Sequence, residues 1–485
     1  GANTATTFNI QGDADFIGSI TNITVEEVGQ EWTLTDGVSI TAQGARITSD
    51  GTYQEIVQVG ALVIGDTYEI EYEITESVSG TIGFSTNFDS LQLKNTVGVH
   101  KFYGVAQNST TLTIKRGSSP TDITIDNIKV KRLNGDDTPR IDYTDGGCPV
   151  LLTEPQSTNL IIQSNDFSSS SWTKTGSGVV EGFVSPDGSS NAFKLVEDTS
   201  TSSHKMSSPI TNISAGSTTT YSLYVKPEGR TKIGIRESQH AGKYVSFNLS
   251  TKSVISNTGL TANIVESTNG WIRIDFSQSS GGSQERFDLH LLDDAYVSGS
   301  IGSYSYAGDG VSGVSIYGAQ LEELYYSTSY IPTYGAARTR LQESVTGAGT
   351  SSDFNSAEGV LFAEISALGD SLNRYISLSD GTSSNRVSIL YYSVSNRIRT
   401  IISSGGVNVV DLSFLVTSEL DFHKVAVKYN LNDFSLWIDG VEVGTDAFGV
   451  VPIGLSNLSF SDGSGINNFF GKTSQVQVFK TALSD

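Results

Sequence analysis

Apolar and polar residues alternate along many short stretches of the chain. Residues 68–74 read Tyr-Glu-Ile-Glu-Tyr-Glu-Ile, and residues 423–429 read His-Lys-Val-Ala-Val-Lys-Tyr. Alternation of this kind is typical of a strand with one buried face. Asp-Gly pairs at 380–381, 439–440 and 462–463 mark turns of the kind that β-hairpins require. The pattern therefore predicts antiparallel β-structure.

A seven-residue pattern occurs three times. It reads Ile-Thr-Asn-Ile-Thr-Val-Glu at 20–26, Ile-Asp-Asn-Ile-Lys-Val-Lys at 125–131 and, more weakly, Ile-Tyr-Gly-Ala-Gln-Leu-Glu at 316–322. In each copy a kinked start precedes alternating apolar residues, which predicts the closing strand of a module. The first copy has no module before it, so we expect residues 1–29 to be the closing strand of an upstream module, or a strand that another chain completes.

The repeats and the Pro- and Gly-rich breaks divide the chain. We predict an all-β fold of tandem antiparallel β-sandwich (jelly-roll) modules. The predicted modules span residues 30–134, 150–334 and 335–485, with a linker at 135–149. A length of 485 residues fits about three domains of ordinary size.

Composition narrows the class of partner. The formal net charge of −22 repels phosphate backbones, so we expect no nucleic acid partner. No stretch approaches the ~20 apolar residues of a membrane helix, so we expect no membrane insertion. The single cysteine, Cys148, allows no internal disulfide.

Two regions resemble known proteins. Residues 139–147 (Pro-Arg-Ile-Asp-Tyr-Thr-Asp-Gly-Gly) with 151–160, and the later 318–322 with 328–333, resemble a motif of tailed-phage virion proteins. In those proteins the motif precedes a carbohydrate-binding-module-like jelly roll, which the resemblance implies for residues 150–334.

The last module resembles a different fold. Residues 437–440 (Trp-Ile-Asp-Gly) and the final 471–479 are similar to a concanavalin A-like (laminin G-type) sandwich. Together the resemblances imply a phage fibre, spike or capsid-decoration protein on the virion exterior, outside the cell. Such proteins carry adhesive domains and are often homotrimers. The implied partners are host-surface or environmental glycans and other virion proteins, with a role in host attachment.

Candidate catalytic chemistry is confined to one strand. Glu69, Glu71 and Glu73 alternate there, and carboxylates ~5–9 Å apart can hydrolyse glycosidic bonds. The opposing interpretation is a solvated strand face beside a buried one, which we favour. We therefore predict no catalytic residues and no enzyme. Two alternatives stay open beside the glycan-binding hypothesis: a polysaccharide depolymerase, and a purely structural protein that stabilises the capsid.

Aromatic residues are the candidate sugar platforms. Trp32, Trp172, Trp271 and Trp437 lie at strand positions where core packing is expected. Aromatics in turn-rich stretches are the better candidates for glycan binding, although they could equally pack between modules or subunits. These candidates are Tyr304, Tyr306, Tyr325, Tyr326 and Phe469.

Metal and phosphate sites find little support. The five histidines have no zinc-binding spacing. Structural calcium is a candidate at Asp293–Asp294 and at Asp309, on condition that backbone carbonyls converge there; a solvated turn is the favoured interpretation. Residues 465–473 imitate a phosphate-binding loop, but the spacing has one residue too many and the context is all-β.

Overall fold

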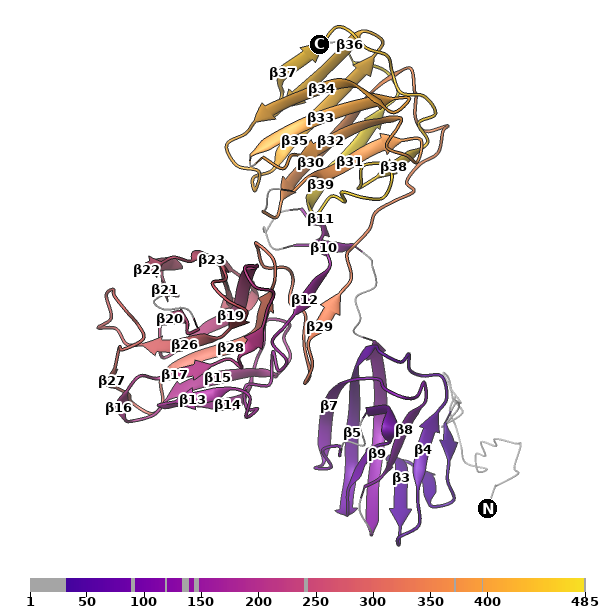
Figure 1. Cartoon of the computed structure of the whole chain (residues 1–485). Helices are drawn as coiled ribbons and strands as arrows, with labels where there is room; N and C mark the ends of the chain where they lie inside the picture. The colour runs from indigo at the N-terminus through magenta and orange to yellow at the C-terminus, as the bar shows by residue number, and fades with distance from the viewer. Residues whose placement is uncertain are drawn as a thin grey trace, which may run out of the picture. The chain divides into compact units, whose positions relative to one another are not determined.

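The computed structural model describes residues 32–88, 92–117, 120–132, 139–143, 148–239, 243–369, 372–394 and 396–483. The chain divides into two compact units, 1–134 and 135–485. Within the described ranges the regular structure is β-strand plus two short 3-10 turns, η1 (Thr86–Phe88) and η2 (Thr268–Gly270), and all paired strands are antiparallel (Figure 1). The predicted all-β class is confirmed. The strand expected within residues 1–29 lies outside the described residues.

The first unit contains one β-sandwich. Its larger sheet has the order β2 (Val38–Thr41), β3 (Gly44–Ser49), β9 (Thr121–Arg132), β5 (Thr67–Ser79) and β7 (Gly98–Val105). Its smaller sheet has the order β1 (Thr33–Leu34), β4 (Glu55–Gln58), β8 (Leu112–Arg116) and β6 (Ile82–Phe84). Strand β5 confirms the predicted alternation over residues 68–74, because the apolar side chains there are all buried: Tyr68, Ile70, Tyr72 and Ile74.

The second module consists of two six-stranded sheets. One has the order β13 (Thr173–Thr175), β17 (Lys205–Ser207), β26 (Phe287–Leu292), β20 (Lys232–Glu237), β21 (Tyr244–Asn248) and β22 (Ser253–Thr258). The other has the order β14 (Ser177–Phe183), β15 (Ala192–Glu197), β28 (Gly313–Glu322), β19 (Thr218–Glu228), β24 (Ile272–Ser279) and β23 (Thr261–Glu266). Two short pairs accompany them: β16 (Thr201–Ser202) with β27 (Tyr306–Ala307), and β18 (Thr211–Asn212) with β25 (Gln284–Glu285). Trp172 and Trp271 are buried, as predicted.

The repeated sequence pattern marks equivalent strands in these two modules. Residues 125–131 lie in β9 and residues 316–322 in β28, and each strand has a partner on both sides. Asn127 and Gly318 have φ angles of 50° and 65°, and the pairing register shifts beside each of them. A left-handed residue beside a register shift is a β-bulge, which Gly and Asn tolerate best. The kinked start is therefore a bulge.

The third module has a seven-stranded and a five-stranded sheet. The first has the order β10 (Arg140–Asp142), β11 (Val150–Thr153), β39 (Gly471–Phe479), β30 (Glu358–Ala367), β35 (His423–Asn430), β36 (Asp433–Ile438) and β37 (Val441–Asp446). The second has the order β34 (Val407–Leu415), β33 (Arg397–Ser404), β32 (Arg386–Tyr391), β31 (Arg374–Ser379) and β38 (Asn457–Ser459). Trp437 is only partly buried, and its indole donates to Ser435 Oγ at 2.9 Å, so its predicted place in the core is wrong.

Strands β10 and β11 correct the predicted boundaries. β11 pairs with β39 and β10 with β11, and Lys472 Nζ lies 3.0 Å from Asp142 Oδ2. Part of the predicted linker 135–149, and the segment from residue 150 that was expected to open the second module, thus belong to a sheet of the third. The second module is inserted between β11 and β30. Its two connections pair with each other as β12 (Ser157–Asn159) and β29 (Arg338–Arg340).

A cluster of four charges lies where these connections leave the third module. Arg140 Nε contacts Glu343 Oε1 at 2.7 Å, its guanidinium also pairs with Glu154, and Arg340 Nη2 lies 2.9 Å from Glu154 Oε2. The side chains of Glu154 and Glu343 are only 4% and 2% exposed. The Glu154 amide donates to Glu343 Oε2 at 2.7 Å, and the Ser329 amide donates to Glu154 Oε1 at 2.9 Å. The cluster therefore ties the incoming and returning chains together.

The residues that resemble phage proteins form a hydrogen-bonded clasp. Asn159 Nδ2 donates to the carbonyls of Ala319 (3.1 Å) and Ile331 (2.8 Å), while its Oδ1 accepts from the amides of Ile161 (3.0 Å) and Leu321 (3.2 Å). One buried amide thus satisfies four backbone groups from three segments. These motif residues close the second module rather than line an open site.

We expect Asn159→Ala to destabilise the second module by about 2–4 kcal/mol, because four buried backbone groups lose their partner. Urea unfolding followed by tryptophan fluorescence measures the loss. The matched control is Asn263→Ala, which removes one solvent-exposed hydrogen bond, from Asn263 to Asp275. This substitution should cost less than about 1 kcal/mol. An equal loss of unfolding free energy in the two variants would contradict the stabilising role of the Asn159 hydrogen bonds.

Candidate functional site

Two of the predicted glycan-binding tyrosines lie inside the second module. The Tyr306 hydroxyl donates to Glu197 Oε2 at 2.6 Å, and the Arg230 guanidinium lies over the Tyr306 ring at 5.3 Å. Tyr304 packs against Tyr306 with ring centroids 6.0 Å apart. Tyr306 is 8% exposed, so its ring has no free face for a sugar. For Tyr306 the prediction is wrong, because its hydroxyl is bonded to Glu197 and its ring is covered by Arg230.

The other three candidates do not form a site together. Phe469 is 1% exposed and belongs to the hydrophobic core of the third module, so its prediction is also wrong. Tyr326 is partly buried, and Tyr325 is 63% exposed. A turn-rich sequence did not distinguish aromatics that fold back into the core from those left at the surface.

The acidic triplet of β5 is engaged by cross-strand partners. Lys101 Nζ donates to Glu69 Oε1 at 2.8 Å, Lys129 Nζ to Glu71 Oε1 at 2.7 Å, and Asn127 Nδ2 to Glu73 Oε2 at 2.7 Å. The hydrogen bond from Lys129 lowers the pKa of Glu71. A general acid needs a raised pKa, so the lowered pKa of Glu71 does not suit it to this role.

The acidic turns proposed for calcium bind their own loops. Asp309 Oδ1 accepts from the amides of Val311 (2.7 Å) and Ser312 (2.6 Å), and the donors of Ser312 lower its pKa. Asp293 accepts the hydroxyl of Tyr304. In the described part of the chain, no three His, Cys, Asp or Glu side chains gather as a metal site. Among the same residues, no helix has the length and hydropathy needed to cross a membrane.

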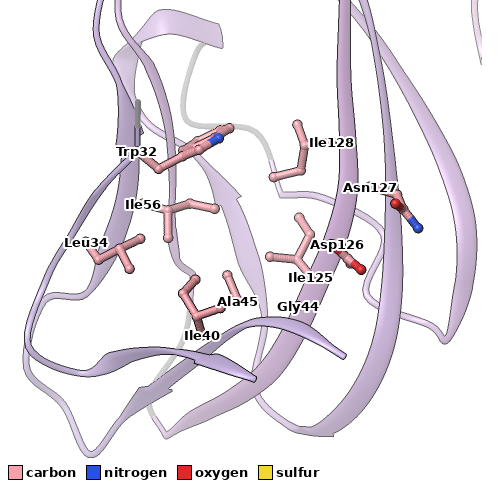
Figure 2. Close-up of a pocket in the computed structure, with 10 residues that line it drawn as sticks. All are labelled: Trp32, Leu34, Ile40, Gly44, Ala45, Ile56, Ile125, Asp126, Asn127 and Ile128. Carbon is pink, nitrogen blue, oxygen red and sulfur yellow. The ribbon is translucent and has the colours of Figure 1, made fainter. Parts of the chain in front are cut away.

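The first module has a small apolar pocket of about 150 Å³ between its sheets. Figure 2 shows Trp32, Ile56 and Ile128 around this space, with Asn127 apart from them. Ligand pockets usually span about 300–1,000 Å³. The space is thus smaller than a usual ligand site, and Trp32 serves mainly to line it, in partial agreement with its predicted packing role.

A larger groove of about 480 Å³ lies at one end of the third module. Four segments converge on it: the return from β29, the start of β31, the turn after β32 and the stretch before β39. It is lined by Gln342, Leu372, Asn373, Arg374, Ser393, Gly465, Ile466, Asn467, Asn468 and Phe470. Four of these carry side-chain amides, and no carboxylate is among the described lining residues.

Packing holds the floor of the groove, and hydrogen bonds hold the backbone of its rim. The Arg374 guanidinium lies 4.7 Å from the centre of the Phe470 ring, and both residues are buried. The Ser393 amide donates to Asn373 Oδ1 at 3.0 Å, and the Asn467 carbonyl accepts from the Tyr375 amide at 3.0 Å. These bonds fix the backbone of the rim.

Exposed side chains of two kinds complete the rim. Leu372 and Ile466 are 52% and 62% exposed, and Gln342 is exposed beside them in the lining. An amide donates and accepts at once, as a sugar hydroxyl does, and the apolar side chains suit the CH face of a ring. The groove can therefore bind a neutral, hydroxyl-rich ligand without changing it chemically.

Sequence reasoning missed this groove. Residues 465–473 were rejected as an imitation of a phosphate-binding loop, yet residues 465–468 and Phe470 line one wall. The available signal was the run Gly-Ile-Asn-Asn at 465–468, since exposed amides in a glycine-rich loop are typical of recognition. Its partner Gln342 is more than 100 positions away, so spacing alone could not join them.

Comparisons with known proteins bear on the fold alone. No family model matches the chain, and no curated protein sequence matches it. Among solved structures the chain is similar to domains LG4–5 of the mouse laminin α1 chain, at 9% identity and a TM-score of 0.22. The match covers 57% of this chain and 91% of that chain. The β-sandwich assignment rests on the sheets described above.

We expect the second module to lose stability as pH falls from about 6.5 to about 4. Burial of His290 in β26 lowers its pKa from 6.5 to about 4, although Asp288 opposes the shift and Lys205 and Arg236 add to it. Below pH 6.5 the unfolded chain binds a proton that the buried imidazole does not bind in the folded module. The free energy of unfolding therefore falls by on the order of 2 kcal/mol. Urea unfolding at pH 7 and 4.5 measures it.

The matched variants are His290→Asn and His100→Asn. The first removes the buried imidazole and should flatten the pH dependence of unfolding. The second removes a partly buried histidine of the first module and should leave the pH dependence of the second module unchanged. An unchanged pH dependence in His290→Asn would contradict this assignment.

Proposed function

We propose that this chain is a non-enzymatic virion protein of a tailed phage that binds glycans through the groove of its third module. The observation that carries the proposal is the groove itself, with four amide side chains beside exposed Leu372 and Ile466. Amides match the hydroxyl groups of sugars, and a space of about 480 Å³ is within the range of ligand sites.

The virion setting is supported by the resemblance of residues 139–147, 151–160, 318–322 and 328–333 to tailed-phage proteins. Under this proposal the chain is a fibre, spike or decoration protein at the particle exterior, next to other virion proteins, and is a homotrimer. Shallow sites bind weakly, and three copies on one particle component would raise the apparent affinity through effective concentration.

The hydrogen bonds made by the three glutamates of β5 favour glycan binding over glycan cleavage. The carboxylates of Glu69, Glu71 and Glu73 each have a donor within 2.8 Å. The depolymerase alternative therefore has no supporting constellation in that strand. The purely structural alternative predicts a groove that binds nothing.

The test is glycan-array binding of the purified chain, with its solution mass measured in parallel. We expect selective binding by a trimer, and roughly tenfold weaker binding for Gln342→Ala and Asn468→Ala, since each removes one amide contact. Gln477→Ala is the matched control, an exposed amide on β39 outside the groove, and should bind normally.

Three outcomes decide between the hypotheses. Binding that weakens only in the groove variants, with bound polysaccharide of unchanged length, supports the proposal. Shortening of the polysaccharide would replace it with the depolymerase. Absence of binding by any oligomer would leave the structural role.

A further inference from the structure

A second pocket, of about 320 Å³, opens on the smaller sheet of the first module. We call it the Tyr53 pocket. It is lined by Tyr53, Gly83, Phe84, Gln92, Lys115, Arg116 and Gly117. Its polar groups are two cations, an amide and a phenol, in contrast to the amide-lined groove of the third module.

The pairing register explains why the pocket is open. Gly83 of β6 lies opposite Lys115 of β8 on one side and opposite Gln92 on the other. Glycine places no side chain between those two neighbours. The floor is therefore bare backbone, with a cation on one wall and an amide on the other.

The two cations lack carboxylate partners. Among the described residues, no carboxylate oxygen lies within 4.0 Å of a side-chain nitrogen of Lys115 or Arg116. Arg116 Nε is buried and has no hydrogen-bond partner in the described structure. The guanidinium of Arg116 is therefore not neutralised by a carboxylate of the described chain, and an anion at its accessible atoms would supply the missing charge partner.

The acid opposite Lys115 is hydrogen-bonded to Tyr53 and not to Lys115. Glu55 lies opposite Lys115 in the register of β4 and β8, but its Oε2 accepts the hydroxyl of Tyr53 at 2.7 Å. Tyr53 is 51% exposed, so one face of its ring is available at the pocket mouth. Aromatic faces pack against the CH faces of sugar rings, and cations bind carboxylate or sulfate through charge-assisted hydrogen bonds.

We propose that the Tyr53 pocket binds a carboxylate or sulfate group carried on a sugar ring. The ring packs on Tyr53, Gln92 bonds a hydroxyl, and Lys115 and Arg116 bind the anion. This site is separate from the third-module groove, and it gives the chain a preference for acidic polysaccharide. The overall charge of −22 opposes anion binding, so the preference depends on these local cations.

The test compares binding of the full chain to a uronic-acid polymer and to the same polymer after carboxyl reduction. We expect the reduction to weaken binding, and Lys115→Gln to weaken binding of the acidic polymer roughly tenfold. Glu55→Gln keeps an acceptor for Tyr53 but removes the neighbouring negative charge, so it should tighten binding roughly threefold. Thermal unfolding checks that each variant is folded.

Lys131→Gln is the matched control, because it removes an exposed cation of the same module on the other sheet. It should leave binding unchanged, and Lys115→Gln should leave binding of neutral glycans unchanged. Equal weakening by Lys115→Gln and Lys131→Gln would overturn the proposal in favour of diffuse charge attraction. Competition by inorganic sulfate as strong as by free glucuronate would overturn the role of the sugar ring. A sulfated polymer that binds while the uronic polymer does not would assign the site to sulfate.

Discussion

The buried ion cluster at the junction organises the second unit of the chain. Arg140, Glu154, Arg340 and Glu343 alternate in charge, and the two glutamates are almost inaccessible to solvent. Removing one member of such a cluster typically costs about 3–5 kcal/mol, because the remaining charges stay buried and unpaired. The cluster fixes where the chain leaves the third module and where it returns, so the sheet of that module can be completed by strands from both sides of a large insertion.

The same junction positions the candidate binding groove. Gln342 lies directly before Glu343, whose carboxylate accepts from the backbone of Glu154 and pairs with Arg140. A rim residue next to a fixed carboxylate has little backbone freedom, which lowers the entropic cost of binding. The opposite wall is held by the bond between the Tyr375 amide and the Asn467 carbonyl. The groove thus consists of exposed side chains on a backbone that the fold has already fixed, as is usual for recognition loops.

Much of the fold was predictable because strand periodicity and bulge chemistry are local. The alternation of β5 and the bulges at Asn127 and Gly318 follow from neighbouring residues alone. The partner of β11 could not be predicted, since Leu151 pairs with Thr473 across more than 300 positions. The site was harder still. Aromatic residues in turn-rich stretches were equally compatible with core and surface, and Phe469 proved to be core while Asn468 beside it lines the groove.

The second module is inserted into the third, so strands from both sides of the insertion share one sheet. Native-state hydrogen exchange of the full chain in increasing denaturant tests this insertion directly. We expect the amides of β11 (Val150–Thr153) to become exchangeable together with those of β39 and β30, because the three strands share one sheet. Exchange of β11 at the rate of an unprotected linker, or together with the strands of the second module, would contradict it.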